Sequence, residues 1–305
     1  NNETFRTEMG PVKEERRRFV VDDPDGFISD ELVQLAYQVH PYHHPVIGFE
    51  EDLEKNIKLQ DGLDFKSNFY SPAYTTIIVT GNFDTPKVLE LIKKYYGDWE
   101  KSPAPEINIP AEPQQVKERV RNYVWKDSQI SPKLLLAFHG PNFELKDYDF
   151  CALHLISRIM FMSSGRITKK LYQDLQLVEH ISGDMEDRKD PGLFVIRTSL
   201  KRGKSLDEVK SLILEEIDRL KNEPVTEKEL EKAKNSVKAE MVYRIESPLS
   251  VAYTIGHYQL TGGDYNLLFE IQKKFKEITP ETIQEVTKKY FTPENRTVLT
   301  LIPKK

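Results

Sequence analysis

Carboxylates and imidazoles are the side chains of this chain that could bind a metal or move a proton. Glu8 and Glu15 stand seven residues apart in a charged stretch, residues 3–22, that the sequence predicts to be helical. Seven residues make about two helical turns, so both carboxylates lie on one face of that helix. Taken alone, the pair is also consistent with a solvated helix face whose acids pair with nearby arginines.

The histidines give a weaker signal. Three of the seven share one short loop: His40, His43 and His44. Pro41 and Pro45 indicate a rigid turn there, which favours a structural loop over a metal site. The single cysteine, Cys151, excludes an internal disulfide and a thiolate zinc cluster.

Composition excludes further classes of function. A net charge of −5 with scattered cations, and an Arg16-Arg17-Arg18 run mixed with acids, gives little support for nucleic acid or a membrane surface. The longest apolar runs, such as residues 134–138, are too short to span a bilayer. Gly262-Gly263 is a turn rather than a phosphate loop, because no Lys-Ser/Thr follows it. A 38% apolar, 30% charged composition is typical of a soluble protein and leaves cytoplasm and periplasm equally open.

One phrase occurs twice, at residues 69–78 and again at residues 290–299. Each copy has two aromatics, a Ser/Thr-Pro break, three variable residues and a β-branched run led by Thr. Each follows a helix-like stretch with an isoleucine at the same distance upstream, Ile57 and Ile278. The repeat predicts a duplicated α/β unit whose first copy is short at its front end.

The pattern of elements predicts an α+β fold, because strands are followed by runs of helices rather than alternating with them. Helices are predicted over residues 3–22, 28–39, 63–70, 85–96, 147–162, 167–177, 205–222 and 226–243, and strands over 75–80, 119–125, 133–140, 193–200 and 297–302. Four prolines mark residues 101–115 as an extended linker. A chain of 305 residues then divides into a first domain at 1–100 and a second at 116–305.

Four motifs carry a family resemblance. In order they are Glu8-x-x-x-Val12-x-x-Glu15-Arg16-Arg17, His40-Pro41-Tyr42-x-x-Pro45-Val46-Ile47-Gly48, Phe69-Tyr70-Ser71-Pro72 leading to Val79-Thr80-Gly81-Asn82-Phe83-Asp84, and Gly165-Arg166-x-x-x-x-Leu171-Tyr172-Gln173-x-Leu175. Over essentially its whole length the chain resembles the pitrilysin/insulinase (M16) zinc metallopeptidases, which include the mitochondrial processing peptidases. The resemblance implies two homologous domains, each an antiparallel-rich sheet covered by helices, with the first incomplete.

The resemblance also implies zinc chemistry. Such enzymes carry His-x-x-Glu-His on a helix, where two histidines bind zinc and the glutamate takes a proton from the bound water. A downstream glutamate is the third ligand, and Glu15 matches it, with Glu8 as a supporting carboxylate. The signature itself is absent, so no catalytic residue is assigned in this chain. The simplest interpretation is a fragment that begins just before the third ligand and is inactive alone.

Two segments come close to the missing signature. Residues 176–180, Gln-Leu-Val-Glu-His, have glutamine in place of the first ligand, and glutamine is a poor zinc ligand. His154, in the sequence His154-Leu-Ile-Ser-Arg158, is interpreted as a degenerate copy of the signature in the second domain and as a near-core histidine rather than a ligand.

Another family feature is missing. Active members place an Arg and a Tyr near the metal, at positions that fall on about Gln176 and Gly183 here. In two-subunit members one subunit carries the zinc ligands and the other this pair. The chain therefore resembles the zinc-bearing subunit of a homo- or hetero-oligomer that hydrolyses peptides or small proteins. The alternatives are a non-catalytic, peptidase-like subunit used for assembly or substrate holding, and an unrelated binding module.

Overall fold

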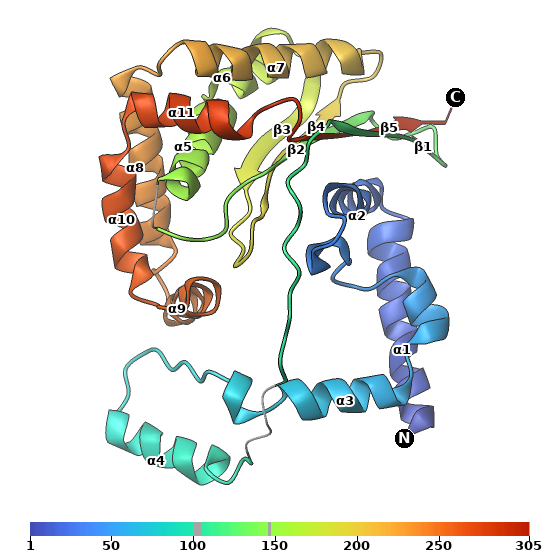
Figure 1. Cartoon of the computed structure of the whole chain (residues 1–305), viewed down its shortest axis with the longest axis vertical. Helices are drawn as coiled ribbons and strands as arrows, with labels where there is room; N and C mark the ends of the chain where they lie inside the picture. The colour runs from blue at the N-terminus through green and yellow to red at the C-terminus, as the bar shows by residue number, and fades with distance from the viewer. Residues whose placement is uncertain (101–104, 146–147, 305) are drawn as a thin grey trace.

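The computed structural model describes residues 1–100, 105–145 and 148–304 (Figure 1). The first four residues of the predicted linker, 101–104, lie outside the described residues. The rest of the linker, 105–115, has neither helix nor strand, as predicted.

The second half of the chain contains a five-stranded sheet. Its strands are β1 (Arg119–Trp125), β2 (Lys133–His139), β3 (Val178–Met185), β4 (Leu193–Leu200) and β5 (Arg296–Pro303). Their order across the sheet is β1-β5-β2-β4-β3, with β5 at an inner position. Only β1 and β5 pair in parallel, and the other neighbours are antiparallel. The antiparallel-rich sheet expected from the family resemblance is therefore confirmed.

A layer of helices covers one face of this sheet (Figure 1). Its members are α5 (Asp149–Phe161), the short α6 (Arg166–Thr168), α7 (Leu206–Asn222), α8 (Glu227–Tyr243), α10 (Leu267–Glu277) and α11 (Pro280–Tyr290). Helix α9 (Pro248–Gly262) contacts α10 and lies away from the sheet (Figure 1). Because α5 is apolar around most of its circumference, it is buried between β3, α8 and α11. Leu134, Leu136 and Phe138 alternate along β2 and point into this core.

The opposite face of the same sheet is covered by a helix from the first half of the chain, α2 (Pro24–Ala36). Ile28 and Leu32 of α2 are buried in one cluster with Leu135 of β2 and with Leu299 and Leu301 of β5. The strands are thus buried on both faces, which explains the nearly continuous apolar run of β2. The two halves are therefore packed into each other.

Residues 1–100, all of them described, contain helices and irregular segments but no strand. The elements are α1 (Asn2–Arg16), which continues as a π-helical turn (Arg17–Val21), then α2, a π-helical turn (Asp52–Asn56), α3 (Leu59–Phe69) and α4 (Thr85–Tyr96). The predicted buried strand at 75–80 is wrong: the segment is unpaired, and Ile77 and Val79 are 44% and 43% exposed. An extended segment becomes a strand only beside a partner, and no described strand lies next to it.

The start of α2 corrects a second prediction. The second helix was expected over residues 28–39, but α2 begins at Pro24 because Asp23 caps it by accepting a hydrogen bond from the amide of Gly26 at 2.8 Å. Gly26 also allows a close approach. A Cβ there would lie 1.7 Å from the carbonyl oxygen of Phe19, so only glycine lets α2 pack against the end of the preceding helix.

The helices of the first half follow the same order as those of the second. The sequence α1, α2, residues 52–56, α3 and then the extended residues 75–80 parallels α8, α9, α10, α11 and β5. Each copy of the repeated phrase begins at the end of an 11-residue helix, α3 or α11. Within the described ranges, none of the helices is both long and apolar enough to cross a membrane.

Candidate functional site

Glu15 lines an open hollow of about 840 Å³ between α1, α2 and the loop at residues 41–47. Asp30 of α2 and His44 of the loop line the same hollow, and Arg188, from the β3–β4 connection, closes one side. Glu15 is exposed toward this space. The hollow is therefore built by both halves of the chain.

The cations next to Glu15 are engaged elsewhere. Arg17 pairs with Glu14 at 2.6 Å and also with Asp22. Arg16 lies 3.6 Å from Asp30 and donates a hydrogen bond to the carbonyl of Gly48 at 3.0 Å. Among the described side chains none forms an ion pair with Glu15, whose carboxylate is solvent-exposed. The choice between a metal ligand and a solvated helix face therefore stays open.

The rest of the hollow is polar but does not complete a metal site. Burial raises the pKa of Asp30 although the charge of Arg16 opposes the change. Glu8 lies two turns before Glu15 on α1 and is exposed. No group of three or more His, Cys, Asp and Glu side chains in the described part of the chain is placed to hold a metal ion. A single carboxylate does not fit a zinc ion, which takes three protein ligands in catalytic sites, so no reaction step can be derived from these residues alone.

The three histidines of the loop face separate partners. His40 is buried, and its Nδ1 accepts a hydrogen bond from the amide of Tyr42 at 3.1 Å. Nδ1 of His43 lies 2.9 Å from the carbonyl of Tyr37, whereas Nε2 of His44 lies 3.4 Å from Asp52. Pro41–His43 form one 3-10 turn, which confirms the rigid turn predicted for this segment.

This turn contacts the second half of the chain. The guanidinium of Arg188 stacks 4.7 Å from the ring centre of Tyr42, whose hydroxyl accepts a hydrogen bond from the amide of Asp190 at 3.3 Å. Tyr37 donates its hydroxyl hydrogen to the carbonyl of Pro191 at 3.0 Å. The His-Pro-Tyr motif therefore fixes the wall of the hollow against the β3–β4 connection.

Two residues outside the motifs hold the end of α2, and sequence reasoning missed both. The carboxylate of Glu112 accepts hydrogen bonds from three successive amides at 2.8–2.9 Å: Gln38, Val39 and His40. Burial acts to raise the pKa of Glu112, but the three amides outweigh it and the pKa is lowered. Arg119 donates to the last carbonyls of α2, including Leu35 at 3.0 Å. Only the proline-rich composition around Glu112 marked this region, and it predicted a linker.

A second cluster of charges surrounds a cavity of about 50 Å³ among α5, α8, α9 and α10. Arg158 lies 2.5 Å from Glu240, which also pairs with Arg244 at 2.7 Å. Nε2 of His154 lies 2.8 Å from a carboxylate oxygen of Asp187. Burial acts to raise the pKa of Asp187, but the contact with His154 and the charge of Arg244 outweigh it and the pKa is lowered. The near-core interpretation of His154 is confirmed.

The other near match lies in a strand. β3 begins at Val178, so residues 176–180 lack the helical face on which two ligands four residues apart would meet. Gln176 adopts a left-handed conformation with φ of 50° just before the strand. At Gly183 an added Cβ would lie 2.3 Å from the ring of Phe161. A tyrosine at Gly183 would therefore require Phe161 to move.

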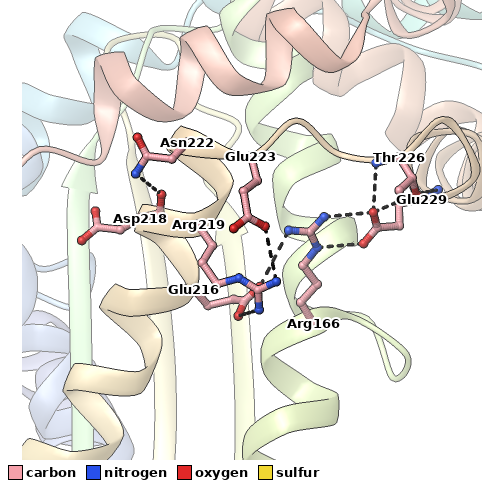
Figure 2. Close-up of polar contacts among 8 residues, drawn as sticks. All are labelled: Arg166, Glu216, Asp218, Arg219, Asn222, Glu223, Thr226 and Glu229. Carbon is pink, nitrogen blue, oxygen red and sulfur yellow. Dashed lines mark hydrogen bonds and ion pairs between the residues drawn. The ribbon is translucent and has the colours of Figure 1, made fainter.

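The Gly165-Arg166 motif forms a structural ion-pair network (Figure 2). Arg166 donates two hydrogen bonds to Glu229, at 2.7 and 2.9 Å, and lies 3.7 Å from the buried Glu216. Glu229 in turn caps α8 through Thr226. The hydrogen bonds of Arg166 lower the pKa of Glu229 to about 2 even though burial opposes the change. Arg166 thus joins α6, α7 and α8.

Comparison with known proteins places these features in a family. A family model described as "Peptidase M16 inactive domain" matches residues 56–237. The zinc protease PqqE of Helicobacter pylori is 28% identical over 302 residues, which cover 98% of this chain and 67% of that protein. The probable mitochondrial-processing peptidase subunit beta of Schizosaccharomyces pombe is 24% identical, covering 86% of this chain and 58% of that protein. The crystal structure of a protease from Helicobacter pylori superposes with a TM-score of 0.90 at 26% identity, over 99% of this chain and 72% of that one.

Proposed function

The chain belongs to the M16 peptidase family, and from this premise we propose that it is part of a zinc-dependent peptidase in which Glu15 is a metal ligand. The observation that carries the proposal is the state of Glu15: an exposed carboxylate facing a hollow, while Arg16 and Arg17, the two residues that follow it, pair with other carboxylates. The histidine ligands and the base then come from polypeptide outside residues 1–305. Glu8, on the same helical face, supports the site from two turns away.

The proposal includes the domain division and the substrate. Residues 1–100 belong to a first domain and residues 116–305 to a second, with 101–115 as the linker between them. A peptide or small protein binds in extended form at the hollow between the halves, since extended peptides bind readily to exposed backbone at sheet edges. The chain by itself does not hydrolyse peptides, because it lacks the base and two of the ligands.

A second candidate function is a non-catalytic, peptidase-like subunit that assembles with an active one. One observation favours it, namely that the matching family model describes an inactive domain. The family resemblance adds that the positions at which active members carry Arg and Tyr fall on about Gln176 and Gly183. The two candidates predict different metal contents for the intact gene product.

The test measures zinc content and hydrolysis of a quenched-fluorescence peptide in the intact gene product. We expect one zinc per molecule, lost together with activity in Glu15→Gln. Glu14→Gln is the matched control, because Glu14 is the adjacent residue and its carboxylate pairs with Arg17. Glu8→Gln is expected to weaken zinc binding by about tenfold. Unchanged zinc in Glu15→Gln would rule out the ligand role, and an intact protein without zinc would favour the non-catalytic subunit.

A further inference from the structure

Arg188 is the only arginine or lysine among the described residues that line the hollow beside Glu15. Two other lining residues, Glu15 and Asp30, are acidic. Most of the remaining lining is apolar and comes from α1 with its π-helical turn, from α2 and from residues 45–47. A largely apolar wall with a few placed polar groups is the arrangement that orients a bound ligand and selects it by its charge.

The guanidinium of Arg188 is held in position, yet most of its donors are unused. It stacks 4.7 Å from the ring centre of Tyr42, and its Nε donates a hydrogen bond to Glu186 at 2.9 Å. Neither Nη1 nor Nη2 has a hydrogen-bond partner in the part of the chain that the structure describes. The side chain is 34% exposed, so both nitrogens are available to a ligand in the hollow.

The β3–β4 connection that carries Arg188 is supported from both halves of the chain. The carbonyl of Arg188 accepts a hydrogen bond from the amide of Phe143 at 2.9 Å, and the amide of Asp190 donates to the hydroxyl of Tyr42 at 3.3 Å. The carboxylate of Glu186 also accepts a backbone hydrogen bond, at 3.3 Å. A recognition group on such a support loses little freedom when a ligand binds, which favours affinity.

A comparison with Arg166 argues against a purely structural role for Arg188. Arg166 donates hydrogen bonds to Glu229 from both Nε and Nη2, lies 3.7 Å from the buried Glu216, and is 18% exposed. Its charge is therefore used within the fold. Arg188 makes one hydrogen bond through its side chain, and the end of its guanidinium lines open space.

We propose that Arg188 selects peptides that carry a carboxylate, which binds to its Nη1 and Nη2 groups. The fork of a guanidinium matches the two oxygens of a carboxylate, and such charged pairs form stronger hydrogen bonds than neutral groups do. The carboxylate belongs to an acidic side chain or to the C-terminus of the peptide. That a peptide occupies the hollow rests on the function proposed above.

The acidic residues of the hollow are compatible with an anionic ligand. Asp30 lies 3.6 Å from Arg16, which balances its charge. Glu15 is exposed, and in the proposed function a metal ion neutralises it. The positive charge of Arg188 is then left to attract the carboxylate of a peptide, with the apolar wall in contact with the neighbouring side chains of that peptide.

The experiment measures kcat/KM of the intact gene product on matched pairs of quenched-fluorescence peptides. In one set the two peptides differ by Glu or Gln at a single position, which is moved along the peptide. In the other set the peptide ends in a free carboxylate or in an amide. We expect one pair to differ by about ten- to 100-fold in favour of the carboxylate. The set that contains this pair identifies the source of the carboxylate.

Two substitutions of Arg188 test its role. Arg188→Gln is expected to abolish the preference by raising KM for the carboxylate peptide, while kcat/KM for its neutral counterpart stays unchanged. Arg188→Lys keeps the charge without the fork and is expected to retain only part of the preference. Lys189→Gln is the matched control, because Lys189 is the adjacent cation, is exposed and does not line the hollow. A preference that survives in Arg188→Gln, or equal rates within every pair, would overturn the proposal.

A binding measurement separates this result from the function proposed above. Fluorescence anisotropy reports the affinity of the same peptides, labelled with a dye, and needs no turnover. A carboxylate preference that is lost in Arg188→Gln, in a protein that holds no zinc, would support the role of Arg188 and contradict the metal role of Glu15. A zinc-bound, active protein without any carboxylate preference would do the reverse.

Discussion

Residues 59–80 and 280–303 carry the same repeated phrase in different surroundings. Both form an 11-residue helix, a proline-containing turn and an extended segment. In the second copy the extended segment is β5, buried between α2 and the helix layer. In the first copy it is unpaired, with Ile77 and Val79 exposed. Helix formation follows from local sequence, whereas a strand needs partners that are distant in the chain.

The strongest test of this comparison is to truncate the side chain at the same position of the repeat in both copies. Leu299→Ala removes a fully buried side chain and is expected to lower the free energy of unfolding by about 2–5 kcal/mol. Ile78→Ala is expected to lower it by only about 1 kcal/mol, because Ile78 is half-buried in an unpaired segment. Urea unfolding of the 1–305 chain, followed by circular dichroism, measures both. Equal losses would mean that residues 75–80 are already packed in solution.

Helices α2 and α9 allow the next comparison. Leu32 of α2 is buried against the sheet, so Leu32→Ala is expected to cost about 2–4 kcal/mol. Tyr253 of α9 is exposed, so Tyr253→Ala is expected to change stability by less than about 0.5 kcal/mol in the same chain. The same urea experiment applies. A large loss at Tyr253 would contradict the exposed position of this side chain on α9.

The smallest change in stability is expected for ion pairs, of which one from each half of the chain can be compared. The pKa of Glu229 is lowered from 4.5 to about 2, so its pairing with Arg166 stabilises the fold above pH 4.5 and is lost as the pH falls toward 2. Arg166→Ala is expected to cost about 1 kcal/mol at pH 7, reduced by solvent screening, and little at pH 2. Arg17→Ala, which removes a solvent-exposed pairing with Glu14 on α1, serves as the control and leaves stability at pH 7 unchanged. A loss for Arg166→Ala that does not depend on pH would contradict the ionic origin.

The sequence predicted the strongly patterned elements well and the long-range ones poorly. The apolar helix α5, the amphipathic α7 and the strands β2 and β4 follow from local periodicity. Three elements were missed. β3 was hidden by its polar residues, α9 carries Gly256 and β-branched residues that weaken a helical pattern, and α10 lies beyond a glycine-rich turn.

The candidate site was predicted in part. Glu15 lies on the predicted helix and lines a hollow, but Arg188 and Glu112 come from distant parts of the chain and no local pattern marks them. The packing of α2 on the sheet could not be predicted from the sequence either. The apolar face of α2 indicates that this face is buried, but it does not indicate which surface buries it. Local sequence therefore does not predict which half of the molecule each helix packs against.

The hydrogen bonds that link Glu112 and Arg119 to the end of α2 have a practical consequence for the purification of this protein. Both residues come after position 105, whereas the helix that they hold ends before position 100. Cleavage of the peptide chain between residues 100 and 105 would therefore yield two bands on a denaturing gel and one peak on a sizing column. The nicked halves would stay together through α2, and a clean gel-filtration profile would not prove that the polypeptide is unbroken.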